Sequence, residues 1–294
     1  MASSAIFFRC DAGTCTCYHH LMARADRGDA AAVAVLVSIQ ADVDAWGRGE
    51  TPMHMASNLG HSAIIIKLVE AGANVDYADR TGCTALMKAS AQGHAATVTT
   101  LCEAGASVDG SNHFGHTALA FACIHGNIVC AKVLSSYGAG RAFMIGSKSM
   151  TADDIATDHD HPALAAWLLS SREWSTPLHH LTIITAAHAR TLLRGGADLH
   201  AACQLGGPTP LSLAKELRTM GNAPEGSAAY IVLCASQPWS PQTHAYFPAA
   251  AREHAVAVLC AGHLLVRDSS FEGVAGVLLD VWMANVLPRA VTRG

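Results

Sequence analysis

The sequence has few aromatic and few charged residues for its length of 294. Aromatic side chains make up 6% of it and charged side chains 14%, whereas 51% of the residues are hydrophobic and many of those are alanine. This composition excludes a core built mainly from large aromatic side chains. Small side chains instead favour an elongated body of short helices that pack at close range.

Clusters of positive charge are also missing. The formal net charge is -4, and no run of lysine and arginine occurs anywhere in the chain. A protein that binds nucleic acid or an anionic membrane surface places clustered cations against phosphate groups. We therefore expect neither nucleic acid nor a membrane as a partner.

Long hydrophobic runs are absent as well. The apolar residues 5–8 are followed at once by Arg9 and Asp11, so they lack the hydrophobic region of a signal peptide. The later apolar stretches, 255–266 and 274–283, are too short to cross a bilayer. Without a secretory context, the ten cysteines predict reduced thiols rather than disulfides. We expect a cytoplasmic or nuclear protein.

What the sequence does contain is an internal repeat. Threonines recur every 33 residues, at Thr51, Thr84 and Thr117. Two sets of glycines keep the same spacing, and these are Gly60, Gly93 and Gly126, and Gly72, Gly105 and Gly138. Because several residue types share one period, the sequence predicts a stack of similar structural units.

Each repeated residue has a structural role in a pair of helices. The threonine hydroxyl caps the start of a short inner helix, and a following proline fits the first helical position. The first glycine set ends that helix in a left-handed conformation, and the second set ends the outer helix that follows. Apolar residues of the outer helices, such as Ile65 and Leu68, form a stripe that one pair cannot bury alone. Stacking the pairs buries it.

Three segments carry a resemblance to a known family. Residues 49–54 read Gly-Glu-Thr-Pro-Met-His, 60–61 read Gly-His, and 71–76 read Ala-Gly-Ala-Asn-Val-Asp. In this order they closely resemble the ankyrin repeat. The resemblance implies an all-α solenoid of helix–turn–helix repeats joined by hairpin-like loops. It also implies that the histidine of the turn ties neighbouring turns, a role that fits His54 and His179. Other residues stand near this position in the intervening repeats, namely Lys88 and Ala120 or Phe121.

The repeats are expected to fill residues 18–236, about seven in number, after an N-terminal tail of residues 1–17. The copy at 146–172 is degraded, because Asp153 replaces an apolar residue and 158–162 replaces the usual Gly-His turn. We expect a local irregularity there that bends the stack into two blocks.

Beyond residue 236 the period fails. Two apolar stretches within 237–294 predict helices, with Pro288 as a stop. A C-terminal helical cap is the simplest interpretation, because the last repeat of a stack needs a modified outer face. The alternative is a segment that docks a second partner.

Metal and catalytic sites find little support. A zinc site near the N-terminus would need ligands at an unfavourable spacing, so an unstructured tail with free thiols is the simpler interpretation. The residues concerned are Cys10, Cys15, Cys17, His19 and His20. A second candidate group, His159, Asp160 and His161, is expected to be a solvated loop. We therefore expect no cofactor.

No phosphate-binding glycine loop, nucleophile elbow or zinc-protease helix occurs. The neighbours Cys123 and His125 fall on an inner helix, where packing or exposure explains them. We predict a chain without enzymatic activity, and keep as an alternative a metal-dependent or thiol enzyme with repeats attached.

The resemblance implies a binding surface on the concave face, formed by loop tips and inner helices. Leu59, Phe114 and Ile124 are apolar where the scaffold does not require it, which predicts an anchor for a partner. The alternative is that each is an isolated exposed residue, which is common on any surface. The whole predicted surface comprises Arg48, Glu50, Asn58, Leu59, Arg80, Thr81, Cys83, Ala91, Gln92, His113, Phe114, His116, Ile124 and His125.

The function expected from these features is that of a scaffold or adaptor, and we expect a monomer that binds a protein partner. A special case is a substrate receptor of a ubiquitin ligase, which would recruit the ligase through residues 237–294. Those residues do not convincingly match the suppressor-of-cytokine-signalling box.

Overall fold

The computed structural model describes residues 16–38, 42–44, 46, 49–146, 148–172, 174, 176–202, 207–237, 244–253 and 255. Its contacts divide the chain into two compact units, Met1–Arg172 and Glu173–Gly294. Each unit is described by itself below.

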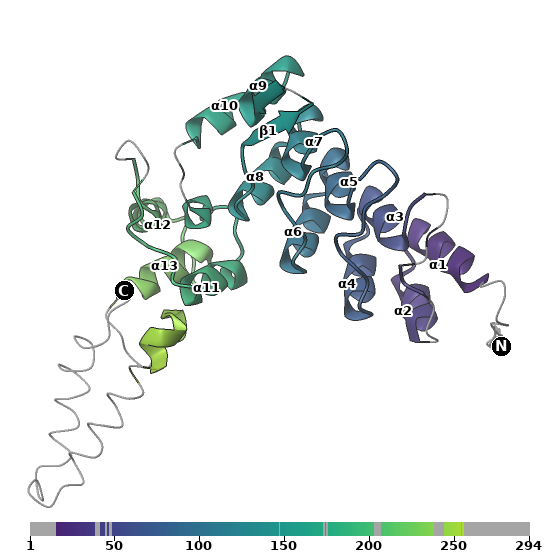
Figure 1. The fold of residues 1–294 in the computed structure, drawn as a ribbon. Coiled ribbons are helices and arrows are strands. Elements are labelled where there is room, and N and C mark those ends of the chain that lie inside the picture. The colour runs from purple at the N-terminus through teal and green to yellow at the C-terminus, as the bar shows by residue number, and fades with distance from the viewer. Residues whose placement is uncertain are drawn as a thin grey trace, which may run out of the picture. The chain divides into compact units, whose positions relative to one another are not determined.

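The first unit is a row of helix pairs that follow one another in sequence order (Figure 1). Each inner helix packs against its outer helix and against the next inner helix. The inner helices are α1 (Thr16–Asp26), α3 (Pro52–Asn58), α5 (Ala85–Gln92), α7 (Ala118–Ile124) and α9 (Ala152–Asp158). The outer helices are α2 (Ala30–Ser38), α4 (Ser62–Glu70), α6 (Ala95–Glu103), α8 (Ile128–Ser136) and α10 (Pro162–Ser170). This mostly helical arrangement fits the expected all-α repeat fold.

Small residues fill the same place in successive inner helices. One alanine recurs in α3, α5, α7 and α9, and it is fully buried each time, at Ala56, Ala89, Ala122 and Ala156. A leucine does the same in the outer helices, at Leu68, Leu101, Leu134 and Leu168. The abundance of alanine in the sequence therefore reflects short helices that pack closely.

The turn after each inner helix has the predicted left-handed glycine. The φ angles of Gly60, Gly93 and Gly126 are 76°, 80° and 68°. A Cβ atom on Gly93 would lie 2.8 Å from Oδ1 of Asn127, which belongs to the next repeat. Glycine is thus required twice at this position, for its backbone conformation and for the close approach of the neighbouring pair.

The side chain that covers each glycine also bonds to the turn beneath it. Nε2 of His94 lies 3.1 Å from the carbonyl oxygen of Asn58. Nδ2 of Asn127 donates to the carbonyl oxygens of Ser90 and Ala91, at 2.8 and 2.9 Å. These bonds satisfy carbonyl groups at the end of the inner helix that have no partner within it. Neighbouring pairs are therefore fixed in register at every turn.

The departure from the repeat at 158–162 does not interrupt the helix pair, because α9 and α10 are of ordinary length. Asp160 takes the place of the turn glycine with a φ of 61°. Aspartate tolerates this conformation better than most residues. His161 then covers Gly126, and its Nε2 lies 3.0 Å from the carbonyl oxygen of Ile124. The degraded sequence thus preserves the turn and its tie to the preceding pair.

A further tie is the histidine near the start of the inner helix. Nδ1 of His54 lies 2.8 Å from the Thr51 hydroxyl and 3.3 Å from the Thr51 amide nitrogen. Its Nε2 lies 2.9 Å from the carbonyl oxygen of Cys83 in the next repeat. The prediction for His54 is confirmed. The equivalent residue in the next repeat is Met87, whose sulfur accepts from the Thr84 amide at 3.5 Å, so Lys88 does not occupy this position.

His179 makes the same contacts in the second unit. Its Nδ1 lies 2.9 Å from the Thr176 hydroxyl and its Nε2 3.2 Å from the carbonyl oxygen of Pro208. The inner helix that it begins is nevertheless reduced to a 3-10 turn, η1 (Pro177–His180). The β-branched run at 182–185 disfavours continuation of the helix. The irregular inner helix therefore lies here and not at 158–162.

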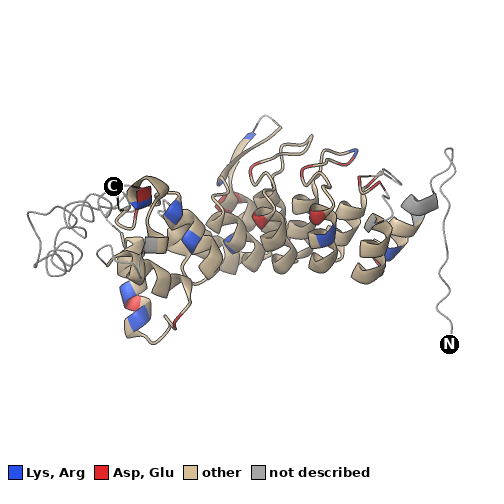
Figure 2. Cartoon of the chain, turned by 90° about the horizontal axis from the view of Figure 1, so that it is seen from below, with Lys and Arg blue, Asp and Glu red and all other residues tan. Residues whose placement is uncertain are grey.

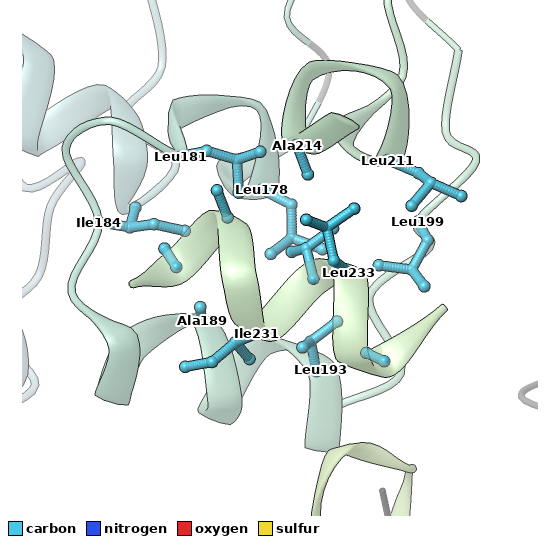
Figure 3. Close-up of a cluster of buried hydrophobic side chains, with 14 residues drawn as sticks. Leu178, Leu181, Ile184, Ala189, Leu193, Leu199, Leu211, Ala214, Ile231 and Leu233 are labelled. Atoms are coloured by element: carbon cyan, nitrogen blue, oxygen red, sulfur yellow. The ribbon is translucent and has the colours of Figure 1, made fainter. Parts of the chain in front are cut away.

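The second unit is built around one apolar core (Figure 3). Leu178, Leu193 and Ile231 are fully buried in it. Its remaining elements are α11 (Ala186–Arg194), α12 (Pro210–Thr219), α13 (Ala228–Ala235) and η2 (His244–Tyr246).

Parts of the domain prediction lie outside the described residues. Of the expected tail 1–17, only the start of α1 at Thr16 is described. Of residues 237–294, the structure describes 237, 244–253 and 255, so all of the two stretches predicted as cap helices except Ala255 lies outside the described residues.

We predict that the cover over the turn glycine makes Gly93→Ala more harmful than Gly72→Ala. Both glycines have left-handed backbones, with φ of 80° and 83°, but a Cβ on Gly72 would meet nothing within 4 Å. The left-handed strain of about 1–2 kcal/mol is common to both variants. In urea unfolding, the free energy of unfolding of Gly93→Ala should be about 1 kcal/mol lower than that of Gly72→Ala, because Asn127 must move. Equal losses of unfolding free energy in the two variants would show that the side chain of Asn127 over Gly93 has no effect on stability.

The environment of His54 predicts a dependence of stability on pH. A carbonyl oxygen only accepts, so Nε2 carries the proton, while Nδ1 accepts from the Thr51 amide. His54 is therefore neutral, and burial lowers its pKa although the bond to Cys83 opposes this. The unfolded chain takes up this proton below about pH 6.5 and the folded chain does not. The stability that neutral His54 contributes is therefore complete above about pH 6.5, and it is lost as the pH falls below this value.

The test compares the wild-type chain with His54→Met, the residue that the next repeat has at this position. Between pH 7.5 and 5.5, the unfolding free energy of the wild type should fall by up to about 1.4 kcal/mol more than that of the variant. The other histidines are the same in both chains and cancel in the comparison. An identical fall in both would rule out His54 as the titrating group.

Candidate protein-binding surface

The loops that lead into the inner helices project from one side of the row of helices in the first unit (Figure 2). We call three of them fingers: 74–84, 107–117 and 141–151. The first two close with a single antiparallel bridge, Ala78 with Thr84 and Ser111 with Thr117. The third is a hairpin of β1 (Ala142–Ile145) and β2 (Lys148–Thr151).

Aspartates bind the base of each finger to the loop of the preceding repeat. The carboxylate of Asp76 accepts from the amide of Ser107 at 2.8 Å, and that of Asp109 accepts from the amide of Gly140 at 2.8 Å. Asp44 accepts from the amide of Asn74 in the same way. The fingers are therefore held at their bases as a set.

Polar side chains also fix the finger tips. Oδ1 of Asn112 accepts from the amides of Phe114 and His116, at 3.0 and 2.9 Å. Asp79 occupies the equivalent place in the first finger and accepts from the amides of Thr81 and Cys83. A side chain carried on these tips thus extends from a backbone that is already ordered.

Exposed apolar side chains gather on adjacent fingers. Phe114 is 61% exposed and Met144 is 60% exposed. The two fingers touch here, since the Met144 carbonyl oxygen leaves no room for a Cβ on Gly115. The rings of Trp46 and Tyr77 form a second pair, with centroids 5.5 Å apart and exposures of 39% and 36%. Large apolar groups that contact little of their own fold are available to a partner.

The inner helices add aromatic and apolar groups. The Phe121 ring lies between those of His116 and His125, with centroid distances of 5.6 and 6.5 Å. Burial lowers the pKa of both histidines, and for His125 the neighbouring His159 and His161 lower it further. This part of the surface is therefore uncharged at neutral pH. Leu59 is exposed at the end of α3.

A small ion network lies on the same side. Nζ of Lys88 is 2.9 Å from Asp79 and 3.1 Å from Glu50. Burial alone would raise the pKa of Asp79, but hydrogen bonds from Thr81, Lys88 and Cys83 outweigh it and lower the pKa to about 2. The positive charge of Lys88 is therefore shared between two carboxylates, those of Asp79 and Glu50.

Most residues of the predicted surface are accessible. The prediction is wrong for Cys83, because this residue is only 8% exposed. Its amide donates to Asp79, its carbonyl oxygen faces His54, and its sulfur accepts from Asn112, so the finger closes over it. Arg48 lies outside the described residues. Asn58, Leu59, Arg80, Thr81, Gln92, His113, Phe114 and His125 are exposed, while Glu50, Ala91, His116 and Ile124 are half-buried.

Four residues of this surface were not predicted from the sequence. They are Trp46, Tyr77, Phe121 and Met144. Trp46 and Tyr77 lie in successive loops at a spacing close to the repeat, and this signal could have identified them.

The thiols of Cys102, Cys123 and Cys130 are packed in the interior. Burial raises the pKa of Cys102 and Cys123 to about 12 and that of Cys130 to about 11. Cys123 is therefore a protonated thiol at neutral pH and not a nucleophile activated by His125.

No group of three or more potential metal-ligating side chains occurs among the described residues. Asp160 and His161 are used in the turn described above. Cys10 and Cys15 lie outside the described residues, as do the side chains of Cys17 and His19, whereas His20 is exposed. None of the helices described is long and apolar enough to span a membrane.

Comparison with known proteins agrees with the geometry. Residues 20–112 match the family described as "Ankyrin repeats (3 copies)". The match begins in α1 and extends through α6 into the second finger. No curated protein matches the chain. The helix pairs, the glycine turns and this match together show that residues 20–112 are ankyrin repeats.

Proposed function

We propose that this chain is a non-catalytic scaffold or adaptor that binds a protein partner on the concave face of its repeats. Ankyrin repeats generally mediate interactions between proteins. The observation that carries the proposal is the pair Phe114 and Met144, two large side chains about 60% exposed on fingers that touch each other. Neither side chain supports the helix pairs.

The ordered backbone beneath these side chains favours binding. Asn112 and Asp109 hold the second and third fingers before a partner arrives, so little conformational entropy is lost on association. Full burial of a phenylalanine side chain contributes about 1.5–3 kcal/mol. Arg80 and His113 lie at the rim of the proposed site, where water screens the charge of Arg80.

We also propose that the repeats continue beyond the matched segment, to residue 236. The pairs α7 with α8 and α9 with α10 keep the glycine cover and the buried alanine of the matched repeats. In the second unit, His179 repeats the contacts of His54. Affinity purification of the full chain, with Phe114→Ala as a parallel bait, would identify the partner by its absence from the variant.

We expect Phe114→Ala to weaken binding to the identified partner by about 2 kcal/mol or more, because the anchor is fully desolvated. Arg80→Ala should cost about 1 kcal/mol or less. Val129→Ala is the matched control, since Val129 is 56% exposed on the outer helix α8. Calorimetric titration measures all three. A loss for Val129→Ala as large as that for Phe114→Ala would place the partner elsewhere.

The alternative of a ubiquitin-ligase receptor depends on residues 237–294. Phe247 and Ala255 are buried, and Arg194 donates to the carbonyl oxygen of Ala245, so a truncation should retain them. We predict that deletion of 257–294 leaves the affinity for the partner within about twofold. Loss of ubiquitin-ligase subunits from the purified complex, with the partner retained, would favour the receptor function. Loss of the partner itself would contradict the concave-face proposal.

A further inference from the structure

The second unit contains a pocket of about 220 Å³ between η1 and α12. Its walls include the indole of Trp174, the ring of His179 and the side chains of Leu213, Leu217 and Met220. This volume is below the roughly 300–1,000 Å³ of pockets that hold small-molecule ligands or cofactors. It matches a single amino-acid side chain better.

One wall of the pocket belongs to the core of the unit. Leu181 lines it and is also buried in the core of the unit, on the segment that follows η1 (Figure 3). The Trp174 ring stacks on that of His179, at 6.5 Å between centroids, and meets the ring of His180 edge-on at 4.8 Å. The indole is thus positioned by residues that the fold already fixes.

The pocket carries one formal charge. Burial lowers the pKa of His179, although its backbone hydrogen bonds oppose this, so its ring is neutral. Glu216 is the remaining ionisable side chain of the lining, and it is exposed. Among the described residues its carboxylate forms no ion pair. Lys215 and Arg218 stand one and two positions away on the helix, a spacing at which side chains do not face each other.

We propose that this pocket binds a long basic side chain, lysine or arginine, of a protein partner. The alkyl stem of such a side chain would pack on Leu213 and Leu217. Its cation would meet the Glu216 carboxylate and the π-face of Trp174, two groups that both attract positive charge. The site is separate from the surface around Phe114 and goes beyond the function proposed for it.

The test uses n-butylammonium as a lysine side-chain analogue and 1-butanol as its uncharged counterpart. The full chain is labelled with 5-fluorotryptophan, and the signal of Trp174 is assigned by its loss in Trp174→Phe. We expect n-butylammonium to shift this signal saturably at millimolar concentrations. Its affinity should exceed that of 1-butanol about three- to tenfold and should fall as salt is added.

Variants separate the charge from the apolar walls. Glu216→Gln should reduce the affinity for n-butylammonium to that for 1-butanol, whereas Glu225→Gln, an exposed acid of the same unit outside the pocket, should not change it. Phe114→Ala should leave it unchanged too, so failure here is distinct from failure of the concave-face proposal. Equal affinities for the two probes, an unaffected Glu216→Gln variant or no shift of Trp174 would each overturn the assignment.

Discussion

The close approach of neighbouring helix pairs at the glycine turns is the contact on which the first unit depends. At Gly60, Gly93 and Gly126 the next repeat places a histidine or an asparagine where a Cβ would stand. The same side chain bonds to a carbonyl oxygen at the end of the preceding inner helix. Register between pairs is thus set by backbone geometry at the turn, and buried alanines allow the inner helices to pack closely.

The position of the fingers follows from this register. Once the pairs are aligned, Asp76 and Asp109 each lie at the base of the next finger and bind its amide. Asn112 then orders the tip that carries Phe114. The proposed binding surface therefore needs no reorganisation of its own, because the contacts between pairs hold the fingers. Exposure of Phe114 and Met144 is a consequence of stacking and not of a flexible loop.

The sequence predicted the fold where a residue's role is local to its repeat. Threonine caps and turn glycines act on their own backbone, so their period alone identified the helix pairs. The prediction failed where a different residue occupies the position: Asp160 replaces the turn glycine, and Met87 replaces the histidine and accepts a bond from the Thr84 amide. The shortening of η1 was missed because the Thr-Pro-Leu-His turn before it is intact.

The candidate site was harder to predict, because exposure depends on how the fingers fold. Phe114 and Leu59 were identified as apolar residues at variable positions, and both are exposed. Cys83 occupies an equally variable position but is enclosed by contacts with Asp79 and Asn112 from two repeats. The pocket beside Trp174 joins η1 to α12, segments well separated in the sequence. No pattern within one repeat reports such contacts.

Hydrogen–deuterium exchange of the full chain, with and without its purified partner, tests whether the fingers bind the partner. If fingers fixed by contacts between repeats present an apolar surface to the partner, exchange should slow in the fingers 107–117 and 141–151 and at the end of α3. Exchange in the outer helices α4, α6 and α8 should be unchanged. Protection confined to those outer helices, with exchange in the fingers unaltered, would contradict the proposed binding surface.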